Sequence, residues 1–299
     1  MNFIKKNTIL IVLVLLSILS IILVLKWQKN LVFVNEKYKV VSKEKIFIGN
    51  KSFLLLLLEK VSNKPPDIQE QVFKVYNLTS NQSLSLFEKR EHTIEYRLKD
   101  IDGDKIPEIV LNLWTGGNCW RCRWIEILKI RNERIEKIKI DYPEESMEKW
   151  LKPIELEDLN NDGVEEIIAL DSRWEFYQNV CHACSPEVYV IFSLEDGVYK
   201  ISSKNFPNFY ENEIKRLEKI LNNEYYSSYS NEEYYFGKLI SLLINYIFKG
   251  EKEKGLLELK KYAEKYNFQS KNFKEEIEYI KRNLDKWISE VNIDKLIKE

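Results

Sequence analysis

The sequence predicts a segregated α+β protein, with an N-terminal transmembrane helix, an antiparallel β-repeat domain and C-terminal helical hairpins. Three observations predict it. Residues 8–25 are uncharged and mostly apolar. Residues 31–207 contain short runs rich in Val, Ile, Phe and Tyr between turn residues, a pattern typical of antiparallel sandwiches or propeller blades. Residues 208–299 contain few Gly or Pro and repeat apolar residues at helical spacing.

Composition limits the function classes. The chain has 299 residues, of which 44% are hydrophobic, so it can bury a substantial core and is not disordered over most of its length. Lys and Arg number 46 against 47 Asp and Glu, a net charge of -1, which does not fit binding to nucleic acid through bulk charge. Only two histidines occur, which excludes mechanisms that need several imidazoles.

The first element is the predicted membrane anchor, residues 1–30. As a helix, the apolar run is about 27 Å long, close to the hydrocarbon thickness of a bilayer. Lys5 and Lys6 precede it, and Trp27 follows at a position suited to the membrane interface. A cleaved signal peptide is the alternative, but it needs small residues before the cut, and residues 1–40 contain no alanine. We therefore expect a single-pass, uncleaved anchor in the cytoplasmic membrane, with the body periplasmic or extracellular.

The predicted β domain occupies residues 31–207 and the helical domain residues 208–299. The expected strands are 45–48, 53–58, 71–76, 93–98, 109–113, 123–130, 166–170 and 188–194. Apolar residues at helical spacing predict helices near 239–247, 256–266 and 273–291, packed as hairpins.

An acidic segment occurs twice, 58 residues apart from Asp100 to Asp158. Each copy lies between two strand-like stretches. The residues that match are Asp100, Asp102, Asp104 and Glu108 in the first copy and Asp158, Asn160, Asp162 and Glu166 in the second. Because the acidic positions recur in both copies, a shared chemical role is indicated.

The spacing of these oxygen-bearing side chains predicts calcium. Ca²⁺ prefers six to eight oxygen ligands, which side chains at loop positions one, three, five and nine and a backbone carbonyl at position seven supply. The predicted ligands are Asp100, Asp102, Asp104, Ile106 and Glu108, and Asp158, Asn160, Asp162, Val164 and Glu166. Four carboxylates favour tighter binding by the first loop, while Lys105 at position six, where the second loop has Gly163, opposes it. The alternative is an acidic turn without metal, since Asp, Asn and Gly favour turns.

The patterns Asp-x-Asp-Gly-Asp-x-x-Pro-Glu-Ile and Asp-x-Asn-x-Asp-Gly-x-x-Glu-Ile resemble FG-GAP/VCBS-type repeats. The Trp114-Thr-Gly-Gly117 stretch and the cysteine after it also resemble some bacterial exported proteins with such repeats. The resemblance covers about residues 93–205. It implies propeller-blade-like sheets with calcium in loops between strands, and binding or adhesion more often than catalysis. Residues 40–98 are a candidate degenerate third unit without the acidic loop.

All four cysteines lie in two Cys-x-x-Cys pairs, Cys119/Cys122 and Cys181/Cys184, each after an acidic loop and its exit strand. Three interpretations stay open. Disulfides suit an oxidising compartment. A zinc site made by all four thiolates suits the paired spacing, although the pairs are further apart than in common zinc motifs. A redox-active pair is the third, although the thioredoxin-like βαβ context is missing.

The resulting hypothesis is a membrane-anchored, extracytoplasmic binding module with structural calcium, and no enzyme. Its expected partners are the membrane, through the anchor, and a protein or glycan of the cell envelope. The alternative is a thiol–disulfide oxidoreductase, or another envelope enzyme, that uses a Cys-x-x-Cys pair. The expected cofactor is calcium, with zinc as the alternative occupant of the cysteines.

Overall fold

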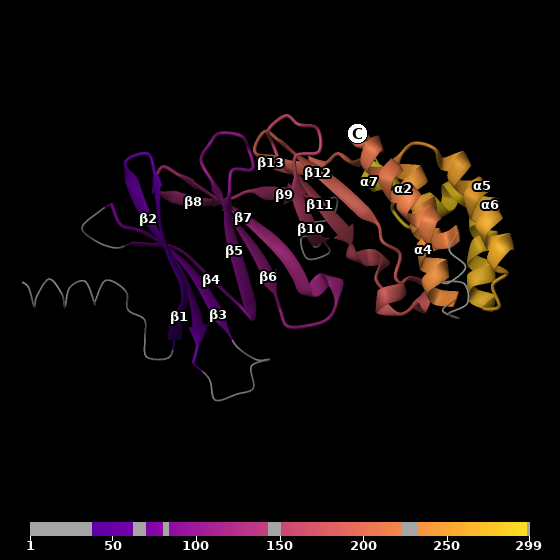
Figure 1. Cartoon of the computed structure of the whole chain (residues 1–299), viewed down its shortest axis with the longest axis horizontal. Helices are drawn as coiled ribbons and strands as arrows, with labels where there is room; N and C mark the ends of the chain where they lie inside the picture. Colours follow the sequence, from indigo (N-terminus) through magenta and orange to yellow (C-terminus); the bar gives the residue numbers. More distant parts are fainter. Residues whose placement is uncertain (1–37, 62–69, 80–83, 143–150, 223–231, 298–299) are drawn as a thin grey trace, which may run out of the picture. The chain divides into compact units, whose positions relative to one another are not determined.

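The computed structural model describes residues 38–61, 70–79, 84–142, 151–222 and 232–297 (Figure 1). The chain forms two compact units, divided after Arg90. The predicted anchor, residues 1–30, lies outside the described residues. Within the described part, no helix is long and apolar enough to cross a membrane.

The first unit is built around one four-stranded antiparallel sheet whose strands follow chain order. Its strands are β1 (Tyr38–Ile48), β2 (Lys51–Lys60), β3 (Gln71–Asn77) and β4 (Leu84–Glu91). The run Phe53–Leu58 in β2 is buried on both faces, as expected for a strand of continuous leucines in the interior of a sheet. The candidate third unit, residues 40–98, includes this sheet but extends past the division after Arg90, and its being a repeat stays a prediction.

The second unit contains two further sheets, and none of the described sheets closes into a barrel. One has the order β5-β6-β7-β8 and the other β10-β11-β12-β13-β9. The strands are β5 (Thr93–Lys99), β6 (Glu108–Trp114), β7 (Arg123–Arg131), β8 (Arg134–Lys137), β9 (Lys139–Asp141), β10 (Leu151–Glu157), β11 (Glu166–Asp171), β12 (Tyr189–Glu195) and β13 (Val198–Ile201). The expectation of antiparallel sheets needs one correction, because β9 pairs in parallel with β13. The chain leaves β8 and runs directly along the outer edge of the next sheet.

The two sheets of the second unit share an arrangement of three consecutive antiparallel strands, β5-β6-β7 in one and β10-β11-β12 in the other, with matching register. Ile109 pairs with Leu128 across β6 and β7, and Ile167 pairs with Phe192 across β11 and β12. Ile109 and Ile167 are 58 residues apart, but Leu128 and Phe192 are 64 apart. The second copy therefore contains extra residues between its second and third strands, where the second cysteine pair lies.

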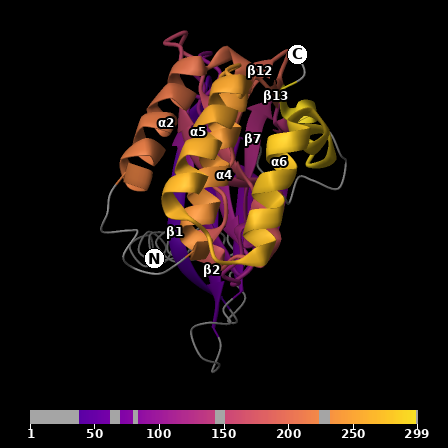
Figure 2. The same ribbon diagram turned by 90° about the vertical axis from the view of Figure 1, so that its right-hand side faces the viewer.

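The helices follow the last strand. They are α2 (Pro207–Asn222), α4 (Glu232–Phe248), α5 (Lys252–Tyr266), α6 (Lys271–Glu290) and α7 (Asp294–Ile297), and Figure 2 shows the four longer ones side by side. Every residue of α4 from Tyr235 to Phe248 is buried, which is the pattern of a helix enclosed on all sides. In α6, Phe273, Ile277 and Ile280 lie on one buried stripe, as their spacing predicts.

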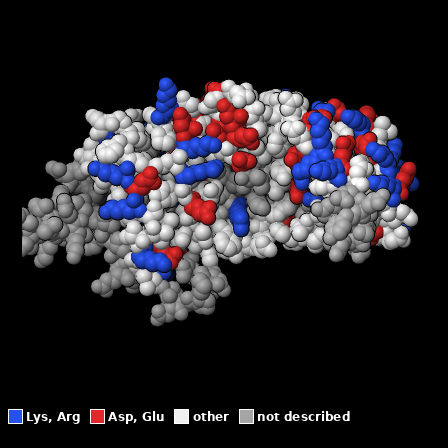
Figure 3. Space-filling view, in the orientation of Figure 1, with Lys and Arg blue, Asp and Glu red and all other residues white. Residues whose placement is uncertain are grey.

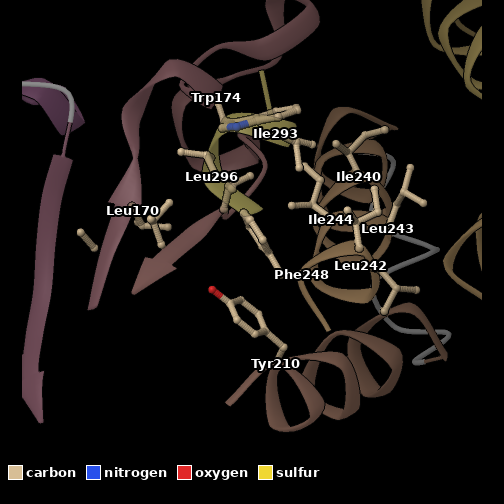
Figure 4. Close-up of a cluster of buried hydrophobic side chains, with 14 of the residues drawn as sticks. Leu170, Trp174, Tyr210, Ile240, Leu242, Leu243, Ile244, Phe248, Ile293 and Leu296 are labelled. Atoms are coloured by element: carbon tan, nitrogen blue, oxygen red, sulfur yellow. The ribbon is translucent and has the colours of Figure 1, made fainter. Parts of the chain in front are cut away.

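One hydrophobic core joins the helices to the two sheets of the second unit. Figure 4 shows Leu170 of β11, Trp174, Tyr210 of α2 and Phe248 of α4 around a common interior. Gly237 of α4 has no room for a side chain, because a Cβ atom there would lie 1.8 Å from the carbonyl oxygen of Cys184. The change from strands to helices at Pro207 therefore falls inside one compact unit.

Candidate functional site

The two acidic loops connect equivalent strands in the second unit. The first acidic loop, Asp100–Glu108, joins β5 to β6, and the second acidic loop, Asp158–Glu166, joins β10 to β11. In each copy the glutamate at loop position nine is the first residue of the exit strand. The two acidic segments that match in sequence therefore also occupy equivalent positions in the two sheets.

The same hydrogen bonds hold both loops. At position one, Asp100 Oδ2 accepts the Lys105 N–H at 2.9 Å, and Asp158 Oδ2 accepts the Gly163 N–H at 2.9 Å. At positions five and nine, the matching bonds run from Ile106 to Asp104 (2.8 Å), Val164 to Asp162 (2.8 Å), Ile101 to Glu108 (3.1 Å) and Leu159 to Glu166 (2.9 Å). We expect a difference in cation affinity to come from side chains in and around the loops, such as Asn160, whose Nδ2 donates to Asp162 Oδ2 at 2.9 Å where the first loop has Asp102. The roles of the Ile106 and Val164 carbonyls as calcium ligands stay predictions.

Loop position six requires a left-handed backbone. The φ angle is 67° at Lys105 and 87° at Gly163. Glycine adopts this region at little cost, whereas a side chain with a Cβ atom does so under strain. The strain expected for Lys105 is therefore present in the first acidic loop and absent from the second.

A lysine that sequence reasoning missed occupies the centre of the first acidic loop. The Lys129 ammonium, from β7, lies 2.7 Å from Asp104 and 3.2 Å from Glu108, and it also pairs with Asp102. Only 6% of the Lys129 side chain is exposed, and that of Glu108 is fully buried. Asp100, Asp102 and Glu108 each bring one oxygen within 4.8 Å of the others. An internal cation therefore already lies among these carboxylates and offsets part of their charge.

The ionisation of these groups reflects burial and the lysine. Burial raises the pKa of Glu108 above its usual range. Burial alone would also raise the pKa of Asp104, but hydrogen bonds from Lys129 and Ile106 outweigh it and hold that pKa below its ordinary value. Burial disfavours the Lys129 ammonium, yet the surrounding carboxylates reverse this effect and raise its pKa. The lysine is therefore firmly charged in the fold.

The second acidic loop has a serine where the first has this lysine. Since Leu128 and Phe192 hold equivalent register positions, Ser193 corresponds to Lys129. The Ser193 hydroxyl donates to Glu166 Oε1 at 3.3 Å. Among the described residues, no lysine or arginine forms an ion pair with Asp158, Asp162 or Glu166, and burial raises the pKa of Glu166. These three carboxylates are also not gathered as closely as those around Lys129, which fits repulsion between like charges.

The two acidic loops touch each other. A Cβ atom on Gly103 would lie 3.1 Å from the carbonyl oxygen of Gly163. The Glu165 N–H donates to the carbonyl of Ile101 at 2.9 Å, and the Lys99 ammonium lies 2.5 Å from the Glu165 carboxylate. The two loops are therefore in direct contact, so a conformational change in one requires the other to adjust.

Each Cys-x-x-Cys pair forms a disulfide of its own, Cys119–Cys122 and Cys181–Cys184. Among the described residues, no metal-sized cluster contains sulfur atoms from both pairs. The structure therefore shows the disulfide alternative for the cysteines rather than one four-sulfur site. The pairs nevertheless lie near each other, because the rings of Trp120 and His182, one from within each pair, are 6.0 Å apart.

The second disulfide is surrounded by titratable side chains. His182 Nδ1 lies 2.7 Å from Glu175 Oε1, which also accepts the Trp120 N–H at 2.9 Å. The Glu175 side chain is fully buried, and its Oε2 atom has no hydrogen-bond partner. From α4, the Glu233 carboxylate accepts the Cys181 N–H at 2.6 Å and lies within 4.8 Å of both sulfur atoms of the pair. With the disulfide closed, these sulfurs cannot act as thiolate ligands for a metal.

Comparisons of the chain with family models, curated proteins and solved structures found no match. The resemblance to FG-GAP/VCBS-type repeats stays a prediction. The candidate sites therefore rest on the chemistry of this chain alone.

Proposed function

We propose that this chain is a membrane-anchored, extracytoplasmic binding module whose β repeats are stiffened by one structural calcium ion in the second acidic loop. The observation that carries the calcium assignment is the exchange of Lys129 for Ser193 between two loops with matching backbone hydrogen bonds at positions one, five and nine. The second loop holds three carboxylates without a lysine or arginine partner in the described chain, and a divalent cation would offset their mutual repulsion.

The assignment reverses the order of affinity expected from carboxylate number. That expectation did not count Lys129, whose ammonium lies among Asp102, Asp104 and Glu108. A calcium ion in the first acidic loop would have to displace this buried lysine, which would then lose its counter-charges. In the second acidic loop, the ion would displace no cation of the described chain.

A protein or glycan of the cell envelope is the proposed partner. On the face shown in Figure 3, positive and negative side chains alternate over the helical region and form no single-sign surface. The helices carry ion pairs between neighbouring side chains, such as Lys249–Glu211 and Lys261–Glu258. A mixed surface does not supply the positive field that nucleic acids need.

Calcium content and thermal unfolding of the full chain, purified in detergent, test the proposal. After dialysis against buffered calcium, we expect one equivalent of bound calcium and a higher melting temperature than in a chelator. Asp158→Asn should remove both effects. The matched Asp100→Asn variant should keep the bound calcium, because Lys129 already occupies the position of a cation in its loop. A chain that binds no calcium, or an Asp158→Asn variant that binds as much as wild type, would overturn the assignment.

A further inference from the structure

The two disulfides occupy equivalent places but have different surroundings. Cys119 and Cys122 are both partly exposed. In the second pair, Cys181 is exposed while Cys184 is buried in the hydrophobic core. An exposed sulfur accepts an incoming thiolate, and a buried partner sulfur is shielded from competing reactions. Only the second pair therefore has the asymmetry that directed disulfide exchange needs.

A buried carboxylate orients the histidine inside the second pair. Glu175 Oε1 accepts the proton of His182 Nδ1, so Nε2 is the ring atom that exchanges protons with its surroundings. Glu175 Oε2 is buried without a hydrogen-bond partner, an arrangement that costs free energy. His182 lies between Cys181 and Cys184 in the chain, and a base oriented by a carboxylate is the kind of group that activates sulfur nucleophiles.

The helix α4 supplies a second charge at this disulfide. The Glu233 carboxylate lies within 4.8 Å of Cys181 and Cys184 sulfurs and disfavours a thiolate there by like-charge repulsion. The closed disulfide carries no such penalty. The pair therefore favours the oxidised state, and its reduced form needs a base to react.

We propose that Cys181 and Cys184 form a thiol–disulfide exchange centre that reduces disulfides of extracytoplasmic proteins, with His182 as the base and Glu175 as its positioning residue. The proposal goes beyond the binding function and does not depend on calcium. The structure holds the oxidised product of the exchange. A dithiol must reduce the pair before each turnover.

The exchange proceeds in two balanced steps. His182 Nε2 takes the Cys181 thiol proton, and the thiolate attacks one sulfur of the partner's disulfide. A bond forms between Cys181 Sγ and that sulfur, the partner's disulfide breaks, and the leaving thiolate takes the proton from His182. Cys184 then loses its proton to His182 and attacks Cys181 Sγ. This closes the internal disulfide and releases the second partner thiolate, which takes that proton. Two electrons and two protons pass to the partner.

The first experiment compares the two disulfides within one full chain, purified in detergent. The protein is reduced with dithiothreitol and mixed with a synthetic peptide that contains one internal disulfide. Samples are quenched by alkylation, and mass mapping then follows each pair. We expect Cys181–Cys184 to close at least about tenfold faster than Cys119–Cys122. Equal rates, or a faster first pair, would overturn the proposal without bearing on the calcium site.

A trapping experiment identifies the attacking sulfur. The Cys184→Ser variant should accumulate a mixed disulfide between Cys181 and the peptide, because the second step is blocked. The matched Cys122→Ser variant leaves Cys119 in the equivalent place and should trap much less. Equal trapping by the two variants would contradict the proposal.

Variants of the base test its role. His182→Asn and Glu175→Gln should slow the closure of the second pair by roughly 100-fold, the lower end for general acid–base catalysis, and flatten its pH dependence. Within the part of the chain that the structure describes, the charged groups that contact His182 or approach the disulfide are Glu175 and Glu233, while Trp120 contributes a ring and an N–H. Closure of Cys119–Cys122 is the internal control and should not change. An unchanged pH profile, or reduced cysteines that bind zinc and fail to exchange, would refute the assignment.

Discussion

The first and second acidic loops share their backbone hydrogen bonds and differ in where a positive charge comes from. The first loop takes it from Lys129 on the neighbouring strand β7, and the second has Ser193 at the matching place. The second loop also has Gly163 at the position where Lys105 strains the first. The comparison teaches that the residues on neighbouring strands, and not the acidic motif alone, decide whether a side chain of the protein supplies a positive charge to the loop.

The largest expected effect comes from removing the internal cation. Lys129→Met keeps most of the side-chain volume but leaves the buried Glu108 and its acidic neighbours uncompensated. Breaking a buried ion pair costs about 3 kcal/mol or more, so we expect a loss of about that size in the free energy of unfolding at pH 7 in a chelator, measured by denaturant titration.

The control for this change is Lys200→Met. Lys200 is an exposed lysine on β13 that pairs with the exposed Glu195, and its replacement should alter stability by no more than about 0.5 kcal/mol. If Lys129→Met were as mild as this control, the first acidic loop would not depend on its lysine.

The next effect comes from placing a lysine in the second acidic loop. Ser193→Lys should supply the missing ammonium and abolish calcium binding there. At a free calcium concentration 100 times the dissociation constant, wild type gains about 2.7 kcal/mol, and this gain should vanish in the variant. Calcium titrations followed by thermal unfolding measure this gain.

Ser193→Met is the matched control, because methionine is nearly as long as lysine but carries no charge, and this variant should still respond to calcium. If both variants lose the response, the size of the side chain and not its charge is the cause.

Much of the fold could be predicted from the sequence, because the signals are local. The expected strands 53–58, 93–98 and 123–130 fall within β2, β5 and β7, since apolar and β-branched runs between turn residues favour pleated pairing. The helical spacing of Phe273, Ile277 and Ile280 likewise predicted the buried face of α6.

The composition of the sites could not be predicted, because it depends on register between distant strands. A constant shift of 58 residues would align Lys129 with Glu187, whereas the structure aligns it with Ser193. Lysine within the apolar run Ile125–Ile130 was the one signal available, since a charge there needs a buried partner. The parallel pairing of β9 with β13 is similarly non-local. The contact between Glu175 and His182 is close in sequence but lies in an irregular segment between strands, where no periodic pattern predicts which side chains meet.

A smaller effect tests the strain at loop position six. Lys105→Gly should raise the free energy of unfolding by about 1 kcal/mol, because it relieves a left-handed backbone. Gly163→Ala should lower it by about the same amount in a chelator, and no atom within 4 Å of the added Cβ would complicate the result. Denaturant titration of both variants measures the two changes, and changes of the same sign would show that the loops are not equivalent at this position.

The smallest effect is the contribution of Asp104 to stability, which should be lost in acid. Asp104→Asn removes a charge that pairs with Lys129 at 2.7 Å from a partly exposed position, so it should cost only about 0.5 kcal/mol at pH 7. Because the pKa of Asp104 is lowered in the fold, this contribution is present above its ordinary value of 3.8 and is lost as the pH falls through the lowered value. Wild type and variant should therefore converge in stability at the acid end of a series of denaturant titrations.

Asp162→Asn is the matched change in the second loop, where no lysine of the described chain pairs with the carboxylate. In a chelator it relieves repulsion among like charges but loses the hydrogen bond that Asp162 Oδ2 accepts from Asn160 Nδ2 at 2.9 Å, so the free energy of unfolding at pH 7 should change by no more than about 0.5 kcal/mol. A loss clearly larger than that of Asp104→Asn would mean that a cation of the chain also serves the second loop.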